Sequence, residues 1–265
     1  MATNVASPAP RKGESAWAAR LPAIGAAVGI IVFWQLVVSV FGVPNYIAPG
    51  PIEVIRTFRS EGGILLLNFW PTLMEALLGF VFGNLVAILL AVWFVHNLTA
   101  ERAFYPIAVF INTIPIIAIA PVLVLIFGNG YAPKIIIAGL ICFFPTLVNM
   151  VRGLKAVNPA MLDLMRILSA TKREVFWKVR LQSSLPFLFA ALKIASTTCV
   201  IGAIVGEWIG SNFGLGALII EATYNFRSPL LYATVFLAAG LAVMLFVFVA
   251  LAERYFIRWK SSAVH

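Results

Sequence analysis

The residues whose types and spacing could do chemistry gather in one hydrophilic stretch of this 265-residue chain, residues 152–183. This stretch holds seven of the nineteen lysines and arginines. Elsewhere the candidates are few: the histidines are His96 and His265, too few for a metal cluster, and Cys142 and Cys199 each lie within an apolar run. We interpret the two cysteines as small buried residues rather than a disulfide or metal pair.

Two short helices are expected within this stretch. Asn158 followed by Pro159 is an N-cap with proline at the first helical position. Apolar residues then recur at helical spacing: Met161, Leu162, Met165 and Leu168. Ser169 and Ala170 interrupt that run, and Thr171 with Glu174 forms a capping box that opens the second helix. The product is a helix, a sharp turn and a second helix.

The second helix has one apolar and one basic face. Val175, Phe176 and Val179 form the apolar face, and the basic face consists of Lys172, Arg173, Lys178 and Arg180. Glu174 and Lys178 are spaced to pair at i,i+4. Apolar and charged groups exposed together are typical of a surface that docks on another protein. The alternative is an amphipathic segment that lies on lipid headgroups.

Catalytic motifs are absent from the sequence. It contains no G-x-x-x-x-G-K-[ST], no H-E-x-x-H and no G-x-S-x-G. The chain therefore offers no recognised means of cradling ATP phosphates, and we expect it to bind no cofactor.

The composition indicates a membrane protein that folds as helices. The chain is 62% hydrophobic and 11% charged, with a mean hydropathy of +1.00. A soluble domain of this length cannot hide so much apolar surface. Alternating segments of the kind that a barrel needs are not evident. The net charge of +9 is attributed to membrane topology and anionic headgroups rather than to nucleic acid.

Six spans are expected, because about 20 apolar residues are needed to cross the hydrocarbon as a helix. They lie near residues 21–41, 72–96, 103–127, 133–151, 185–205 and 230–251. Residues 1–20 are expected to be a disordered cytoplasmic tail and 21–260 a single transmembrane domain. A polar turn at 97–102, a Gly128–Gly130 hairpin and a loop at 207–229 connect spans. Pro115 and Pro121 interrupt the third span.

The lysines and arginines divide unequally between the two sides of such a bundle. Fourteen fall on the side of both termini and residues 152–183, and four fall on the other: Arg56, Arg59, Lys134 and Arg227. This bias predicts that both termini and the 152–183 loop are cytoplasmic.

Polar residues at membrane depth are costly, so each of them calls for a structural or functional role. We place Glu75 at headgroup level, Asn84 in a hydrogen bond between helices, and Lys193 as a snorkelling side chain. Asn112 and Thr113, just before Pro115, either line a substrate path or serve helix packing. Glu207 and Trp208 either form an outer gate that meets a binding protein or anchor the helix at the membrane interface.

The 159–182 stretch resembles the cytoplasmic EAA loop of type I ABC importer permeases. In that pattern Asp163 takes the acidic place, Ser169 the glycine place, Val179 and Leu181 the isoleucine and leucine places, and Gln182 the proline place. The surrounding segments NTIPIIAIAPVLVLIFGNG, FFPTLVNMVRGLKAV, SLPFLFAALKIA and AIVGEWIGSNFGLGALI are similar to the nitrate, sulfonate, taurine and thiamin-precursor branch. The resemblance covers about residues 60–260.

The resemblance implies an all-α permease subunit of a bacterial cytoplasmic membrane, with a coupling helix that docks on an ATP-binding-cassette subunit. The implied contact residues are Asp163, Leu164, Arg166, Leu168, Ser169, Ala170, Thr171, Lys172, Arg173 and Phe176. It further implies a second permease copy, two ATPase subunits that bind ATP and magnesium, and an extracytoplasmic binding protein. The solute is a small anion or a vitamin precursor, and the chain itself is not an enzyme.

The rival hypothesis is a secondary transporter with no ATPase partner. Such a carrier would need internal repeats and ionisable coupling residues near the midplane. Neither is evident in the sequence.

Overall fold

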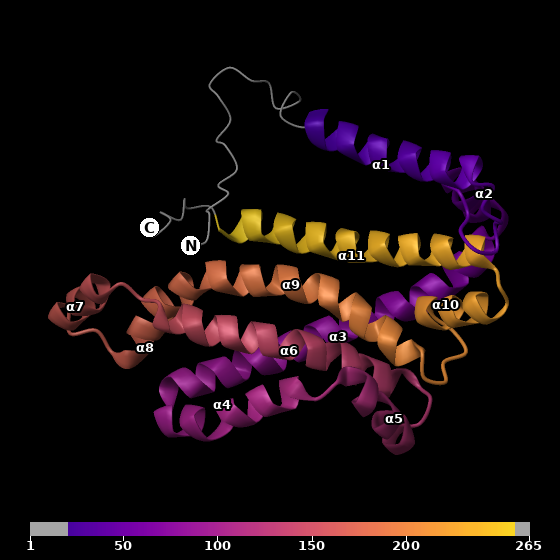
Figure 1. Cartoon of the computed structure of the whole chain (residues 1–265). Coiled ribbons are helices and arrows are strands. Elements are labelled where there is room, and N and C mark those ends of the chain that lie inside the picture. The colour runs from indigo at the N-terminus through magenta and orange to yellow at the C-terminus, as the bar shows by residue number, and fades with distance from the viewer. Residues whose placement is uncertain (1–20, 258–265) are drawn as a thin grey trace, which may run out of the picture.

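The structure is a computed structural model that describes residues 21–257. Within that range every regular element is a helix (Figure 1). The first half of the chain forms α1 (Leu21–Val40), α2 (Pro51–Ser60), α3 (Gly62–His96), α4 (Leu98–Thr113), α5 (Ile116–Phe127) and α6 (Tyr131–Lys155). The second half forms α7 (Pro159–Ile167), α8 (Lys172–Val175), the π-helical turn η1 (Phe176–Arg180), α9 (Leu181–Glu207), α10 (Leu215–Tyr224) and α11 (Ser228–Phe256). The expected tail at 1–20 lies outside the described residues.

Among residues 21–257, five helices are long and apolar enough to cross a membrane, and the bent pair α4–α5 supplies a sixth if it counts as one span. The all-helical membrane fold is thus confirmed. The 97–102 segment is a correction: the chain returns to helix directly after Asn97, whose side chain accepts a hydrogen bond from the Ala100 amide (3.0 Å). A single capping residue replaces the expected polar turn.

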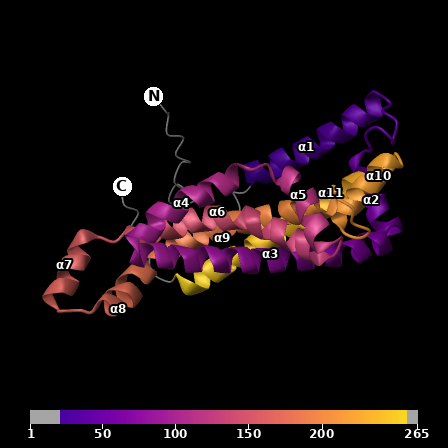
Figure 2. The same cartoon turned by 90° about the horizontal axis from the view of Figure 1, so that it is seen from below.

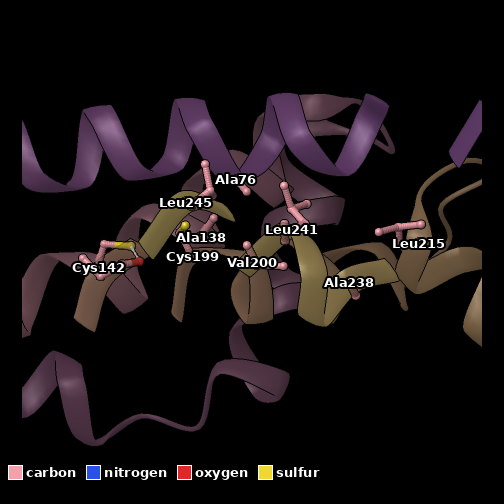
Figure 3. Packing of buried hydrophobic residues seen from close by; sticks show 11 residues of the cluster. Ala76, Ala138, Cys142, Cys199, Val200, Leu215, Ala238, Leu241 and Leu245 are labelled. Carbon is pink, nitrogen blue, oxygen red and sulfur yellow. Dashed lines mark hydrogen bonds between the residues drawn. The ribbon is translucent and has the colours of Figure 1, made fainter. Parts of the chain in front are cut away.

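The core joins α3, α6, α9 and α11, which lie along one another in both views (Figures 1 and 2). Small side chains dominate it, including Ala76, Ala138, Cys142, Cys199 and Ala238 (Figure 3). Small residues let helix backbones approach closely. In a bilayer the hydrophobic effect does not drive helices together, so close packing of this kind stabilises their association. Both cysteines are free and buried, as expected.

The first span stands apart from this core. No residue of α1 is buried. Its Trp34 ring packs against Tyr232 and Phe236 of α11, with ring centroids 5.9 and 6.0 Å apart. Most of the remainder of α1 is apolar and exposed, a surface that lipid can solvate.

The third span is broken rather than merely distorted. α4 and α5 meet at an angle of 97° across Ile114 and Pro115. Proline removes a backbone donor and disfavours helical geometry in the residue before it, so the helix ends there. Pro121, by contrast, lies inside α5 without ending it.

The 207–229 segment also differs from expectation, because it contains a helix, α10. Leu215, Leu218 and Ala222 of α10 are buried. The helix begins after Gly214, whose φ of 118° suits glycine alone. α10 and α2 lie at one end of the molecule, and α7 and α8 project from the other (Figure 1).

Candidate functional site

The projecting end is built on α7. The Asn158 side chain accepts a hydrogen bond from the Ala160 amide (2.9 Å), as the N-cap prediction requires. None of the residues of α7 is buried. Leu164, Ile167 and Leu168 expose 48%, 80% and 66% of their surface. Large apolar side chains that lie exposed together on a projection from the bundle are unusual, and they indicate a contact surface.

Charged groups rim this apolar surface. Arg166 Nη1 lies 2.7 Å from Asp163 Oδ1, and both side chains are well exposed. Thr171, Lys172 and Arg173 are exposed at the start of α8. The structure therefore brings the predicted docking residues of α7 and the start of α8 to one end of the molecule. Whether they contact an ATPase subunit stays a prediction.

The turn between α7 and α8 has the geometry that its sequence suggested. Ser169 has a φ of 51°, in the left-handed region. Its amide donates to the Arg166 carbonyl and the Ala170 amide to the Met165 carbonyl, both at 2.9 Å. These two bonds form a Schellman motif. Thr171 and Glu174 then form the predicted capping box. Lys178 Nζ lies 3.4 Å from Glu174 Oε1, the expected pair.

Phe176 is a correction. It was expected as an apolar anchor for docking, but only 8% of its surface is exposed. Its ring packs against His96 with centroids 4.9 Å apart and belongs to the core formed with α3, α4 and α6. Phe176 thus fixes the base of the projection, while the neighbouring Trp177 is exposed.

At the opposite end, Glu207 is fully buried. Thr72 Oγ1 donates to Glu207 Oε1 (2.6 Å), and the Gly216 amide donates to Oε2 (2.5 Å). Thr72 also accepts a hydrogen bond from the Leu215 amide (2.8 Å). The carboxyl group therefore ties the start of α10 to α9 and α3. Trp208 is exposed beside it, so the two predicted gate residues point to different surroundings.

Glu75 is also not where it was expected. Because α3 begins at Gly62, Glu75 lies thirteen residues into the helix, and its side chain is fully buried between helices rather than exposed to headgroups. Lys134 Nζ of α6 lies 3.3 Å from Glu75 Oε1. The sequence pattern did not predict Lys134 as a partner of Glu75. Its signal was an acidic and a basic residue that each lie near the outer end of their spans.

Three further polar residues have defined places. Asn84 accepts a hydrogen bond from Thr146 Oγ1 (2.5 Å), which confirms a bond between helices. Lys193, which was expected to snorkel, forms an ion pair: its Nζ lies 2.9 Å from Glu253 Oε2 of α11. Asn112 lines a cavity of about 100 Å³ at the α4–α5 break, and Thr113 is exposed beside it.

A bundle of apolar helices with one broken span and a helical projection at one end defines a polytopic membrane transport subunit. Residues 83–259 match the family described as binding-protein-dependent transport system inner membrane component, and the chain belongs to this family. The predicted family is thereby confirmed. The chain is a permease subunit of an ABC importer.

Relatives with different solutes in their names are similar to this chain over most of their length. The chain is 34% identical over 233 residues to the formylaminopyrimidine transport permease protein ThiX of Halalkalibacterium halodurans, covering 88% of this chain and 93% of the relative. It is 32% identical to the riboflavin transport system permease protein RibX of Chloroflexus aurantiacus, covering 91% and 92%. It is 25% identical to a putative aliphatic sulfonates transport permease protein, SsuC of Bacillus subtilis, covering 91% and 87%.

Solved structures support the fold. The chain superposes on the MetNI methionine ABC transporter in an inward-facing conformation with a TM-score of 0.61 and 21% identity. The match covers 73% of this chain and 95% of that chain.

Proposed function

We propose that this subunit acts as half of a translocation pathway and is driven through α7 by a separate ATPase. The full importer would contain two copies of this permease, two ATP-binding-cassette subunits and one extracytoplasmic binding protein. ATP and magnesium would bind the cassettes, so the chain itself catalyses no reaction.

The exposed apolar surface of α7 is the observation that carries this proposal. Leu164, Ile167 and Leu168 are presented to water at the tip of a projection whose base is held by Phe176. Burying them in a groove of a soluble partner would release about 25 cal/mol per Å² of apolar surface. A rigid base lets the helices move with the partner rather than bend at the turn.

The orientation follows from the charges. Arg56, Arg59, Lys134 and Arg227 belong to the end that carries α2 and α10, whereas the basic residues of α7, α8 and η1 belong to the other. The positive-inside bias supports a cytoplasmic location for the α7 end. The α2 and α10 end would then face the binding protein, with Trp208 exposed on that side.

The broken span is the proposed site of the pathway. Helix breaks expose backbone groups that must be satisfied in lipid unless they line a cavity. Asn112 and Thr113 lie at the break, and the cavity beside Asn112 is otherwise lined by apolar side chains of α4, α5 and α6.

We infer that the solute is an uncharged vitamin or vitamin precursor rather than an anion. Among the described residues inside the spans, Lys134 and Lys193 are each paired, with Glu75 and Glu253. Neither ammonium is left to balance an anionic solute at depth. Two of the relatives above 30% identity are named for formylaminopyrimidine and riboflavin, which supports the same class, and a third, at 36%, carries no solute in its name.

The test is Leu168→Asp in the assembled transporter, with Leu168→Met as the matched control. A carboxylate at the centre of the apolar surface should reduce co-purification of the cassette subunit, and both ATP-driven uptake and binding-protein-stimulated ATP hydrolysis should fall at least about tenfold. The methionine variant should retain all three. Unchanged uptake in Leu168→Asp, or uptake driven by an ion gradient without ATP, would contradict the proposal.

A further inference from the structure

A basic pocket lies at the base of the projection, between the end of α3 and the helix that α8 and η1 begin. Its volume is about 330 Å³. His96, Lys172 and Arg180 line it, together with apolar side chains that include Val95 and Val175. None of the residues that line it is acidic. The pocket therefore suits an anion that carries an apolar group.

The acidic side chains of this end of the molecule are already paired. Residues 97–180 contain three of them, and their partners are all basic: Glu101 pairs with Lys155, Asp163 with Arg166 and Glu174 with Lys178. Among residues 21–257, neither Lys172 nor Arg180 forms an ion pair. Arg180 Nη1 donates to the Leu154 carbonyl (3.2 Å), which orients the guanidinium and leaves its other donors for a ligand.

His96 is oriented by two contacts. Its Nδ1 lies 2.8 Å from the Val92 carbonyl oxygen, to which a protonated nitrogen donates. Its ring packs on Phe176 with centroids 4.9 Å apart. Nε2 is therefore the nitrogen left for a ligand, and it becomes a donor when the imidazole is charged.

Two exposed tryptophans indicate that the pocket lies at the level of lipid headgroups. Trp93 precedes His96 by one turn of α3, and Trp177 follows Phe176 in η1. They expose 43% and 56% of their surface. Tryptophan is enriched where the hydrocarbon of a bilayer meets the headgroups. A ring of this kind on each of the two helices that form the pocket is typical of that boundary.

An apolar stripe on α3 leads to the pocket. Its members are spaced four and three residues apart, which keeps them on one face of the helix: Phe82, Val86, Leu89 and Trp93, followed by His96. The four apolar side chains expose between 43% and 60% of their surface. From Val86 to His96 the helix rises ~15 Å, about half of a ~30 Å hydrocarbon core. An acyl chain of one leaflet therefore fits along the stripe when its headgroup lies at His96.

The far end of the stripe continues into an apolar groove between α3 and α6. The groove has a volume of about 300 Å³ and is lined by Phe82 and Val86 of the stripe and by Ile136 and Phe143 of α6. Such a groove offers nothing to a soluble anion, whereas it can hold hydrocarbon. Cations at one end and apolar surface along the rest match the two parts of a phospholipid.

We propose that the pocket binds the phosphate of an anionic phospholipid whose acyl chain lies along the α3 stripe. Lys172 and Arg180 pair with the phosphate oxygens, and charged His96 donates through Nε2. Basic pockets between transmembrane helices on the cytoplasmic side bind acidic headgroups in this way. Because the three side chains come from α3, α8 and η1, the bound lipid joins the second span to the base of the projection. The inference goes beyond the proposed function and is independent of the solute.

Lipid binding to the intact transporter, cassette subunits included, tests the site by native mass spectrometry in detergent. The probes are phosphatidylglycerol and phosphatidylcholine with identical acyl chains, which differ only in the headgroup. The apparent affinity for phosphatidylglycerol should be at least about fivefold higher, because choline brings a positive charge to a pocket that already holds cations.

Variants separate this pocket from general attraction to a basic surface. Lys172→Gln and Arg180→Gln should each weaken phosphatidylglycerol binding about fivefold. Arg173→Gln is the matched control, since it removes a charge from the next exposed position, which does not line the pocket, and it should retain the affinity. Because Lys172 is exposed at the start of α8, its variant keeps the test available if Arg180→Gln does not assemble.

Equal affinities for the two lipids, or equal losses in Lys172→Gln and Arg173→Gln, would overturn the site. Displacement of the lipid by millimolar inorganic phosphate would reject it in favour of a soluble anion. Binding of phosphatidylglycerol only after the cassette subunits are removed would reject it in favour of a protein contact. The coupling proposal is tested separately by Leu168→Asp, so either proposal can fail while the other holds.

Discussion

Ser169 is the residue at which local conformation bears most directly on coupling. It occupies the position after the α7 C-cap where a left-handed residue is needed, and glycine is the usual choice there. A non-glycine residue in this region costs about 1–2 kcal/mol. The surrounding bonds to Arg166 and Met165, together with the capping box that follows, hold the turn despite that cost.

Glycine and valine at position 169 should therefore have opposite effects on ATP-driven uptake. Ser169→Gly relieves the strain and should leave uptake and cassette affinity equal or improved. Ser169→Val introduces a β-branched side chain at positive φ and should reduce ATP-driven uptake several-fold. Ser60→Val, at the exposed end of α2, is the matched control and should have no effect. Full uptake by the valine variant would show that the turn geometry does not matter for coupling.

At the scale of the elements, α3 and α6 pack closely through glycines that face each other. A Cβ built on Gly83 would overlap the backbone of Gly139. Neighbouring Asn84 and Thr146 add a short hydrogen bond between the same two helices. Close backbone approach and a polar bond together fix the register of this pair.

Gly83→Val should force α3 and α6 apart. We expect the thermal transition of the purified subunit in detergent to fall by several degrees, because overpacking a tight contact costs typically 1–3 kcal/mol. Gly25→Val in α1 provides the control, since nothing lies within 4 Å of a Cβ there. A transition unchanged in Gly83→Val would mean that the helices repack without cost.

The long apolar runs made most spans predictable, since length and hydropathy alone define them. The capping signals at Asn158 and Thr171 likewise predicted the α7–turn–α8 unit. The sequence did not predict how deeply each polar residue is buried or the angle at which successive helices meet. Pro115 signals a break, but its 97° angle depends on how α5 packs against α6.

The errors share a cause in tertiary contacts. Phe176 was assigned to an exposed apolar face, yet His96, distant in sequence, covers it. Glu75 was placed at headgroup level because the start of α3 was set ten residues too late. Its true surroundings depend on Lys134, 59 positions further along the chain. Single-helix patterns contain no information on such partners.

For the whole molecule, the two ends have different chemistry. The α7 end presents apolar side chains within a basic surround, whereas the α10 end holds buried charges beneath a small pocket. An importer needs this polarity, because one end must meet a cytoplasmic motor and the other a solute carrier. Docking of α7 on an ATPase and delivery of solute at the α10 end therefore both depend on the orientation of the chain in the membrane.

Single cysteines at the two ends should reveal that orientation. The natural Cys142 and Cys199 are buried in the core, so they give little background with a membrane-impermeant maleimide. In right-side-out spheroplasts, Tyr224→Cys at the end of α10 should be labelled and Lys178→Cys in η1 should not; in inverted vesicles the pattern should reverse. Both positions are exposed, so access depends on the side of the membrane alone. Labelling of Lys178→Cys in intact spheroplasts would place the α7 end outside, where no ATPase could reach it.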